Sequence, residues 1–150
     1  MSDSAFDHLV RDLGLALGMA GLRPAEGGQV CQLVFDARHV LQVVHVPARA
    51  QVLLSCQLDA VCLGAAQAQL MARANFMQAG AGAVLCAGSN GRVYLQCALP
   101  MAQARAASLL ACIESLLDQA EAWQARLARE APPGGQPPLR PDPAMFLQSV

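Results

Sequence analysis

The sequence predicts an α+β fold in which an antiparallel, twisted sheet of about five strands packs against helices. Three short apolar runs rich in Val and Leu follow one another at residues 30–35, 40–46 and 51–58. The short connections between these runs favour an antiparallel meander. Amphipathic helical patterns stand before and after the runs. The expected order of elements is therefore α-β-β-β-α-β-β-α.

A first helix is expected at residues 5–20. Polar residues that can cap a helix precede it at residues 2–4. Gly21 and Pro24 are expected to end it. Its large apolar residues recur at spacings of three and four and form one stripe: Phe6, Leu9, Val10, Leu13 and Leu17.

The second strand of the meander carries apolar residues on both of its faces. Leu41 and Val43 share one face, and Val40, Val44 and Val46 line the other. An antiparallel sheet that is covered on one side shows a polar opposite face. We therefore expect one face to meet the helices and the other face to be free to take a partner chain.

A second helix is expected at residues 64–78, followed by a glycine break at residues 80–82. The first half of this helix consists of small residues, which would let another helix approach closely. The segment is therefore a candidate surface for self-association. An Ala-rich helix that packs within its own fold explains the same pattern equally well.

The strongest local signal is a β-hairpin between residues 83–87 and 92–97. Asn90 and Gly91 stand between these two apolar runs, and both residues tolerate the positive φ that a tight hairpin turn requires. The sequence therefore predicts two further antiparallel strands.

A long amphipathic helix at residues 102–130 is expected to close a single domain of residues 1–130. From residue 131 the composition becomes rich in proline, which excludes regular structure and predicts a flexible tail at residues 131–150. The apolar residues 145–147 leave open whether the end of the tail binds an apolar groove.

The apolar stripe of the long helix at residues 102–130 comprises Leu109, Cys112, Ile113, Leu116, Leu117, Ala120, Trp123 and Leu127.

The composition points to an interface and argues against nucleic acid. Apolar residues make up 55% of the chain and charged residues only 14%, against about 25% in ordinary globular domains. Such an excess indicates a surface that meets another protein, although the many Ala residues inflate the apolar count. A net charge of −1 gives no electrostatic footprint for nucleic acid.

No segment of the sequence suggests a membrane span or a secretory signal. The apolar runs are shorter than the ~18–20 residues that cross a bilayer. The first residues include acids where a signal peptide would carry basic residues. We therefore expect a cytoplasmic protein that does not insert into membranes.

The sequence offers no catalytic residue, cofactor site or metal site. The six cysteines form no CxxC pair and show no zinc-finger spacing, so structural thiols in a reducing compartment are expected. His8, His39 and His45 belong to no catalytic motif. The glycines of the break follow a helix and precede a strand, the reverse of a dinucleotide-binding fingerprint.

The order of elements and several packing residues resemble the class I type III secretion chaperones, the Tir-chaperone family, over residues 3–129. The shared features are short, weakly specific motifs of packing residues, and the resemblance rests on their order and spacing. They are Ala74-Asn75-Phe76 before the glycine break, the hairpin strand at residues 93–96, Leu99-Pro100, and Trp123 late in the long helix.

The resemblance implies a cytoplasmic homodimer without enzymatic activity and without a cofactor. Such chaperones bind the N-terminal segment of a secreted effector and keep it soluble for the secretion ATPase. The implied dimer residues are Leu70, Met71, Phe76 and Leu85. The implied effector-binding residues are Phe6, Val40, Val44 and Val46.

Two other functions stay open at the level of sequence. One is a non-catalytic adaptor or regulatory module of the same fold that binds a folded partner. The other is a small enzyme that uses Cys and His. The chain also departs from the resemblance in charge, because its pI of about 6.2 is nearly neutral where such chaperones are typically acidic.

Overall fold

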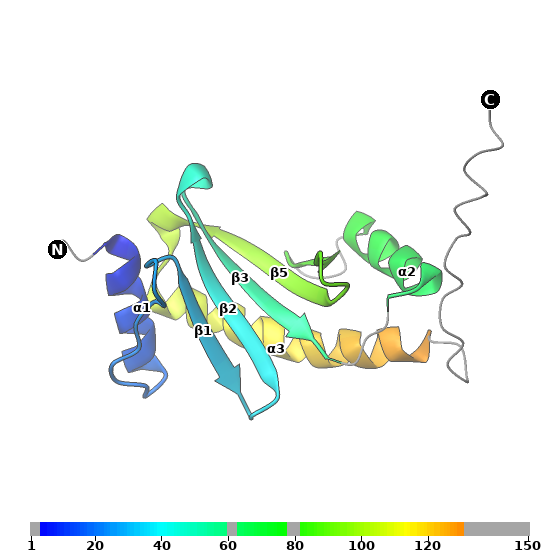
Figure 1. Cartoon of the computed structure of the whole chain (residues 1–150), viewed down its shortest axis with the longest axis horizontal. Coiled ribbons are helices and arrows are strands. Elements are labelled where there is room, and N and C mark those ends of the chain that lie inside the picture. Colours follow the sequence, from blue (N-terminus) through cyan, green and yellow to red (C-terminus); the bar gives the residue numbers. More distant parts are fainter. Residues whose placement is uncertain (1–3, 60–62, 78–81, 131–150) are drawn as a thin grey trace.

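The computed structural model of the chain describes residues 4–59, 63–77 and 82–130 (Figure 1). It confirms the predicted α+β class and the order of elements. The tail at residues 131–150 lies outside the described residues. The elements are α1 (Ala5–Ala16), β1 (Val30–Phe35), β2 (His39–Val46), β3 (Gln51–Leu58), α2 (Ala65–Phe76), β4 (Val84–Ala87), β5 (Val93–Pro100) and α3 (Ala106–Arg129), with short 3-10 turns at Pro47–Arg49 and Met101–Gln103.

The five strands form one antiparallel sheet in the order β1-β2-β3-β5-β4. The first three strands are the predicted meander. The chain then leaves the sheet through α2 and returns as the β4–β5 hairpin, so β5 pairs with β3 and β4 forms the far edge. This arrangement leaves β1 and β4 as the two edge strands.

Helices α1 and α3 cover one face of the sheet, with α3 running along its length (Figure 1). Leu41, Val43 and Leu54 from the strands are fully buried against this layer. The predicted stripe of α3 supplies the other half of the core. Its fully or nearly fully buried members are Leu109, Ile113, Leu116, Ala120, Trp123 and Leu127.

Helix α1 ends at Ala16, four residues earlier than the sequence pattern suggests. Gly18 adopts a left-handed conformation with φ of +71°. The amide of Gly18 donates to the carbonyl of Leu15 at 3.2 Å, and the amide of Met19 donates to the carbonyl of Gly14 at 2.7 Å. This pair of bonds is the Schellman motif, which closes the helix before Gly21 is reached.

Helix α3 begins at Ala106, later than expected, because β5 is longer than the predicted strand. β5 stays paired with β3 as far as Pro100, opposite Gln51. The amide of Met101 then bonds the carbonyl of Ala50 at 2.8 Å. These tertiary bonds hold residues 98–100 in extended structure, which local sequence patterns do not reveal.

A polar contact ties the β1–β2 turn to α3. The Nε2 atom of the buried His39 lies 3.5 Å from Oε1 of Glu121.

Within the described part of the chain, no helix is both long and apolar enough to cross a membrane.

Candidate protein-binding surfaces

The face of the sheet opposite α1 and α3, the outer face, is not covered by any helix among the described residues (Figure 1). The strand pairing arranges its side chains in rows that run across the sheet. One row is apolar and the next is polar. The apolar row consists of Val30, Val44, Leu53 and Ala98. The polar row, called here the glutamine row, consists of Gln32, Gln42, Ser55 and Gln96.

The glutamine row is held together by its own hydrogen bonds. Gln42 Nε2 donates to Gln32 Oε1 at 3.5 Å, and Gln96 Nε2 donates to Ser55 Oγ at 3.1 Å. Ser55 is buried, while the three glutamines keep part of their surface exposed. A hollow of about 410 Å³ lies between this row and the β4–β5 turn, next to Tyr94.

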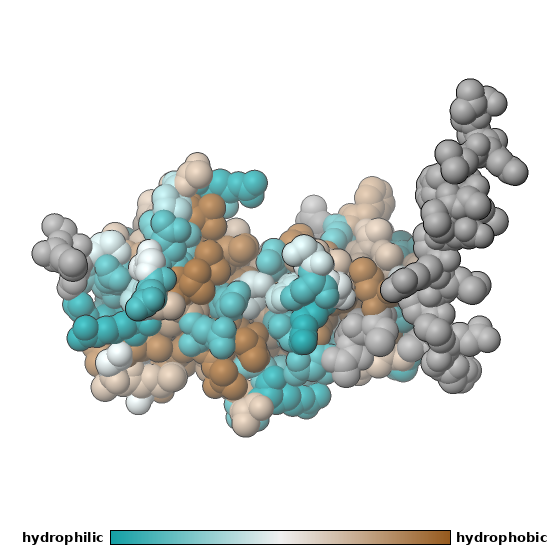
Figure 2. Space-filling model, in the orientation of Figure 1, coloured by the Kyte–Doolittle hydropathy of each residue, from teal (hydrophilic) through white to brown (hydrophobic). Residues whose placement is uncertain are grey.

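A second, shorter apolar strip lies beyond the glutamine row, where Val34 of β1 pairs with Val40 of β2. On β3 and β5 the same row continues with Gln57 and Tyr94. Figure 2 shows hydrophobic patches on both sides of a hydrophilic band across the sheet. None of the outer-face residues of β1, β2, β3 and β5 is charged. The outer face therefore offers two neutral apolar strips separated by hydrogen-bonding groups, a pattern suited to an extended polypeptide.

The structure places three of the four predicted effector-binding residues together on this face. Val40, Val44 and Val46 are half-buried and share the outer face of β2, as the alternation predicted. Phe6 lies on the other side of the sheet and is fully buried. Its ring stacks on His45, with 5.3 Å between the ring centroids, so it supports the sheet from within the core and does not reach the surface.

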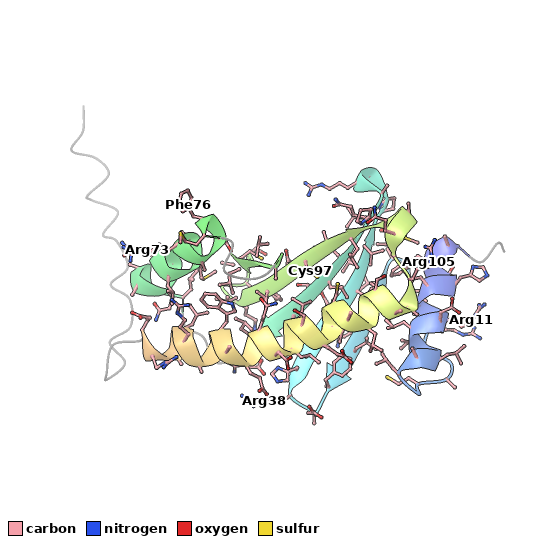
Figure 3. The ribbon with its side chains drawn as sticks, turned by 180° about the vertical axis from the view of Figure 1, so that it is seen from behind. Arg11, Arg38, Arg73, Phe76, Cys97 and Arg105 are labelled. Atoms are coloured by element: carbon pink, nitrogen blue, oxygen red, sulfur yellow. The ribbon has the colours of Figure 1, made fainter. Side chains whose placement is uncertain are left out.

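The predicted dimer residues divide between core and surface. Phe76 is 84% exposed and points away from the body of the molecule (Figure 3). Met71 and Leu85 are buried within the chain itself, and Leu70 is half-buried. Together with Phe76, Met77 (73% exposed) forms an exposed apolar surface at the end of α2.

Helix α2 packs against β4, whose Val84 is 49% exposed. We call Phe76, Met77 and Val84 the α2–β4 patch. Large apolar side chains with such exposure on two neighbouring elements form a candidate interaction site. The resemblance implied Phe76 as a dimer residue but neither Met77 nor Val84, and the Ala-rich α2 has no strong apolar stripe that would orient it.

Asn75 joins α2 to the sheet edge through both ends of its side-chain amide. Its Nδ2 donates to the carbonyl of Leu85 at 2.8 Å, and its Oδ1 accepts from the amide of Leu85 at 2.9 Å. The side chain thus occupies the backbone positions that a neighbouring strand would use. In the sequence, Asn75 stands out only as part of the Ala74-Asn75-Phe76 motif, and the pattern does not explain why an asparagine is needed there.

The described cysteines differ in burial. Cys31 and Cys56 are buried, as expected of structural cysteines, and burial raises the pKa of the Cys56 thiol to about 11. Cys86, Cys97 and Cys112 are only half-buried. No cluster of three or more His, Cys, Asp or Glu side chains suitable for a metal ion occurs among the described residues.

A protein-family comparison agrees with this architecture. The model of the Tir chaperone protein (CesT) family matches residues 8–124, most of the described chain. The chain belongs to the Tir chaperone family. No curated protein matches it in sequence.

Several solved structures share this fold. A chain of the ExsC–ExsE complex matches with a TM-score of 0.73 and 24% identity, covering 83% of this chain and 95% of that one. A chain of the HopA1–SchA chaperone–effector complex gives 0.70 and 22%, covering 81% and 94%. A chain of the ExoT–SpcS complex from Pseudomonas aeruginosa gives 0.62 and 20%, covering 81% and 98%. At these identities the matches establish the fold that the chain shares with them.

Proposed function

We propose that this Tir-family chaperone binds the N-terminal segment of a type III secreted effector in extended form along the outer face of its sheet. The observation that carries the proposal is the uncharged outer face, with the glutamine row between two apolar strips and no helix of the described chain over it. Family membership and the chaperone–effector complexes among its structural relatives support the same reading.

The arrangement of the outer face suits a disordered partner. A segment that orders on binding loses conformational entropy, so it needs a long apolar track to compensate. Val44 and Leu53 on one side of the glutamine row, and Val34 and Val40 on the other, supply such a track. The amides between them offer donors and acceptors that fix the position of the bound backbone.

A second part of the proposal is that two copies pair through the α2–β4 patch. Leaving the large apolar side chains of Phe76 and Met77 in water is unfavourable, and pairing of two copies about a two-fold axis would cover both of them. The dimer would extend the track available to one effector. The chaperone would act in the cytoplasm, without enzymatic activity, and deliver its effector to the secretion ATPase.

The variant Val44→Asp tests the binding face. A carboxylate in the middle of the apolar row would lose hydration without a partner, at a cost of about 2 kcal/mol or roughly 30-fold in affinity. The effector is first identified by pull-down from the native cell and mass spectrometry, and its affinity is then measured by calorimetry. Leu15→Asp is the matched control, because Leu15 is exposed at the end of α1.

Unchanged binding by Val44→Asp would remove the outer face from the site. Limited proteolysis of the complex separates a chaperone from an adaptor that binds a folded partner. A chaperone protects the N-terminal segment of the effector, whereas an adaptor leaves that segment open to cleavage.

A further inference from the structure

Among the described residues, no strand pairs with β5 on the β4 side beyond Gln96, where β4 begins. β4 pairs with β5 only as far as Gln96, opposite Val84. Both backbone groups of Leu85 bond Asn75, so Leu85 faces Leu95 without hydrogen bonds between them. By the alternation of antiparallel pairing, Gln96 and then Ala98 direct their backbone groups toward the β4 side. No strand of the described chain stands opposite Ala98 on that side.

A groove of about 330 Å³ lies between this open edge and α3. We call it the β5–α3 groove. Cys97 and Leu99 line it from β5, and Cys112, Ser115 and Gln119 line it from α3. Gly82 and Ala83, just before β4 begins, close one end of it. Figure 3 shows Cys97 on the strand behind the long helix. The lining contains no charged side chain.

The groove contains an unsatisfied acceptor. Gln119 Nε2 donates to Ser115 Oγ at 2.9 Å, but the buried Gln119 Oε1 has no hydrogen-bond partner. A buried polar atom left unpaired costs free energy and calls for a donor. The groove therefore suits an uncharged extended segment that brings an apolar side chain, backbone groups for Ala98 and an N–H for Gln119.

The end of this chain has that chemistry. Residues 144–150 read Ala-Met-Phe-Leu-Gln-Ser-Val, with no charged side chain and no proline, so every residue keeps its backbone N–H. The preceding residues 131–143 contain six prolines. The match to the family model ends at residue 124, so residues 144–150 lie outside the matched part of the chain.

The segment is long enough to reach the groove. Helix α3 ends at Arg129, and a helical rise of 1.5 Å per residue puts Gln119 about 15 Å and Cys112 about 26 Å back along its axis. Residues 130–143 span up to about 43 Å at ~3.1 Å per residue in an extended proline-rich form. The spacer therefore covers the distance with slack.

We propose that residues 144–150 bind in the β5–α3 groove of the same chain, as an extended strand beside Ala98 with Phe146 against the apolar lining. A short tether gives an effective concentration in the millimolar range, so an intrinsic Kd of ~0.1 mM keeps the groove about 90% occupied. The inference does not depend on effector binding, because it concerns the backbone edge of β5 and the side of the sheet that faces α3.

Photo-crosslinking locates the segment directly. Phe146 is replaced in the full-length chain by p-benzoylphenylalanine, and the cross-linked peptides are mapped by mass spectrometry. The proposal predicts cross-links within one chain to residues 97–99 or 111–119. Cross-links to Phe76 and Met77, cross-links between two chains, or the absence of any cross-link would overturn it.

Thiol protection gives a second, independent measurement. In full-length Phe146→Asp the groove loses its occupant, and alkylation of Cys97 and Cys112 by iodoacetamide should become about tenfold faster, in line with ~90% occupancy. Cys86 lies outside the groove and serves as the internal reference. Gln136→Asp places the same charge in the spacer and should leave all the rates unchanged. Equal rates in both variants would overturn the proposal.

Discussion

Asn75 explains at the scale of one residue how α2 is held against the sheet. Its amide makes two hydrogen bonds of 2.8 and 2.9 Å to the backbone of Leu85 and so acts as a one-residue strand at the edge of β4. Exposed strand edges invite pairing with other chains, and this side chain closes the edge at that position. Among the twenty side chains, Asn fits because it offers a donor and an acceptor at the right separation.

Asn75→Leu should therefore destabilise the fold. It leaves the amide and carbonyl of Leu85, a buried residue, without their partners, which costs about 1–3 kcal/mol. Urea unfolding followed by circular dichroism measures the change. Gln69→Leu is the matched control on the exposed side of the same helix and should change stability by less than about 0.5 kcal/mol. Equal effects of the two variants would contradict the role given to Asn75.

Ser4 and Asp7 form a capping box that couples the start of α1 to pH. The hydroxyl and amide of Ser4 both donate to Asp7 Oδ2, at 2.7 and 2.8 Å, and these bonds lower the pKa of Asp7 below its usual value of 3.8. A carboxyl with a lowered pKa in the folded state stabilises the fold above its unfolded pKa. That stabilisation is lost as the pH falls through the lower, folded-state value.

Asp7→Asn should consequently destabilise the protein at pH 7 and have a smaller effect at pH 3 or below. The reason is that the wild-type carboxyl becomes protonated there and loses its advantage over the amide. Urea unfolding at the two pH values checks the difference. A destabilisation that is the same at both would mean that the capping box contributes nothing through its charge.

At the scale of the elements, periodicity predicted the strands and the core stripes, while tertiary contacts decided the ends. β1 and β3 have the predicted bounds, because they form from local apolar runs. The end of α1 depends on the left-handed Gly18, and the length of β5 depends on pairing with β3. Neither is encoded in the spacing of apolar residues.

The glutamine row lay beyond sequence reasoning for a similar reason. Gln42 is visible as a polar residue on the outer face of β2. Its alignment with Ser55 and Gln96 depends on which strand pairs with β3 after the chain has passed through α2. A shift of one residue in that register would bring different side chains together.

The absence of charge from the outer face predicts how effector binding responds to salt. Affinity that depends on charged pairs falls as ions screen them, whereas apolar and amide contacts are little affected. We expect the Kd for the effector segment to change by less than about threefold between 50 and 500 mM NaCl, measured by calorimetry. Gln42→Glu should introduce a clear salt dependence. A steep dependence in the wild type would move the site to a charged surface of the molecule.

At the scale of the whole molecule, the α2–β4 patch is an apolar surface that a single chain leaves exposed to water. The sequence placed the implied dimer surface in this region, but it could not tell which side chains face outward. The small residues of α2 give no stripe that would orient the helix. As a result Met71 and Leu85 belong to the core of one chain, and Phe76 with Met77 is available to a second copy.

Phe76→Asp is therefore the sharpest test of the dimer. Phe76 is 84% exposed in the single chain, so a carboxylate there leaves the fold intact, but at a two-fold interface it would be buried twice without a partner. Light scattering should show the wild type at about twice the 15.7 kDa chain mass and the variant near the single-chain mass at micromolar concentration. Met71→Asp does not serve this purpose, because it would put a charge into the core.

Leu15→Asp controls for the change in charge, since Leu15 is 66% exposed on α1, away from the patch, and this variant should remain dimeric. Circular dichroism of all three proteins confirms that the fold is kept. A wild type that is monomeric at micromolar concentration would refute the dimer. A Phe76→Asp variant that stays dimeric would place the two-fold axis on another surface, and the outer faces of two copies would then not be joined through α2 and β4.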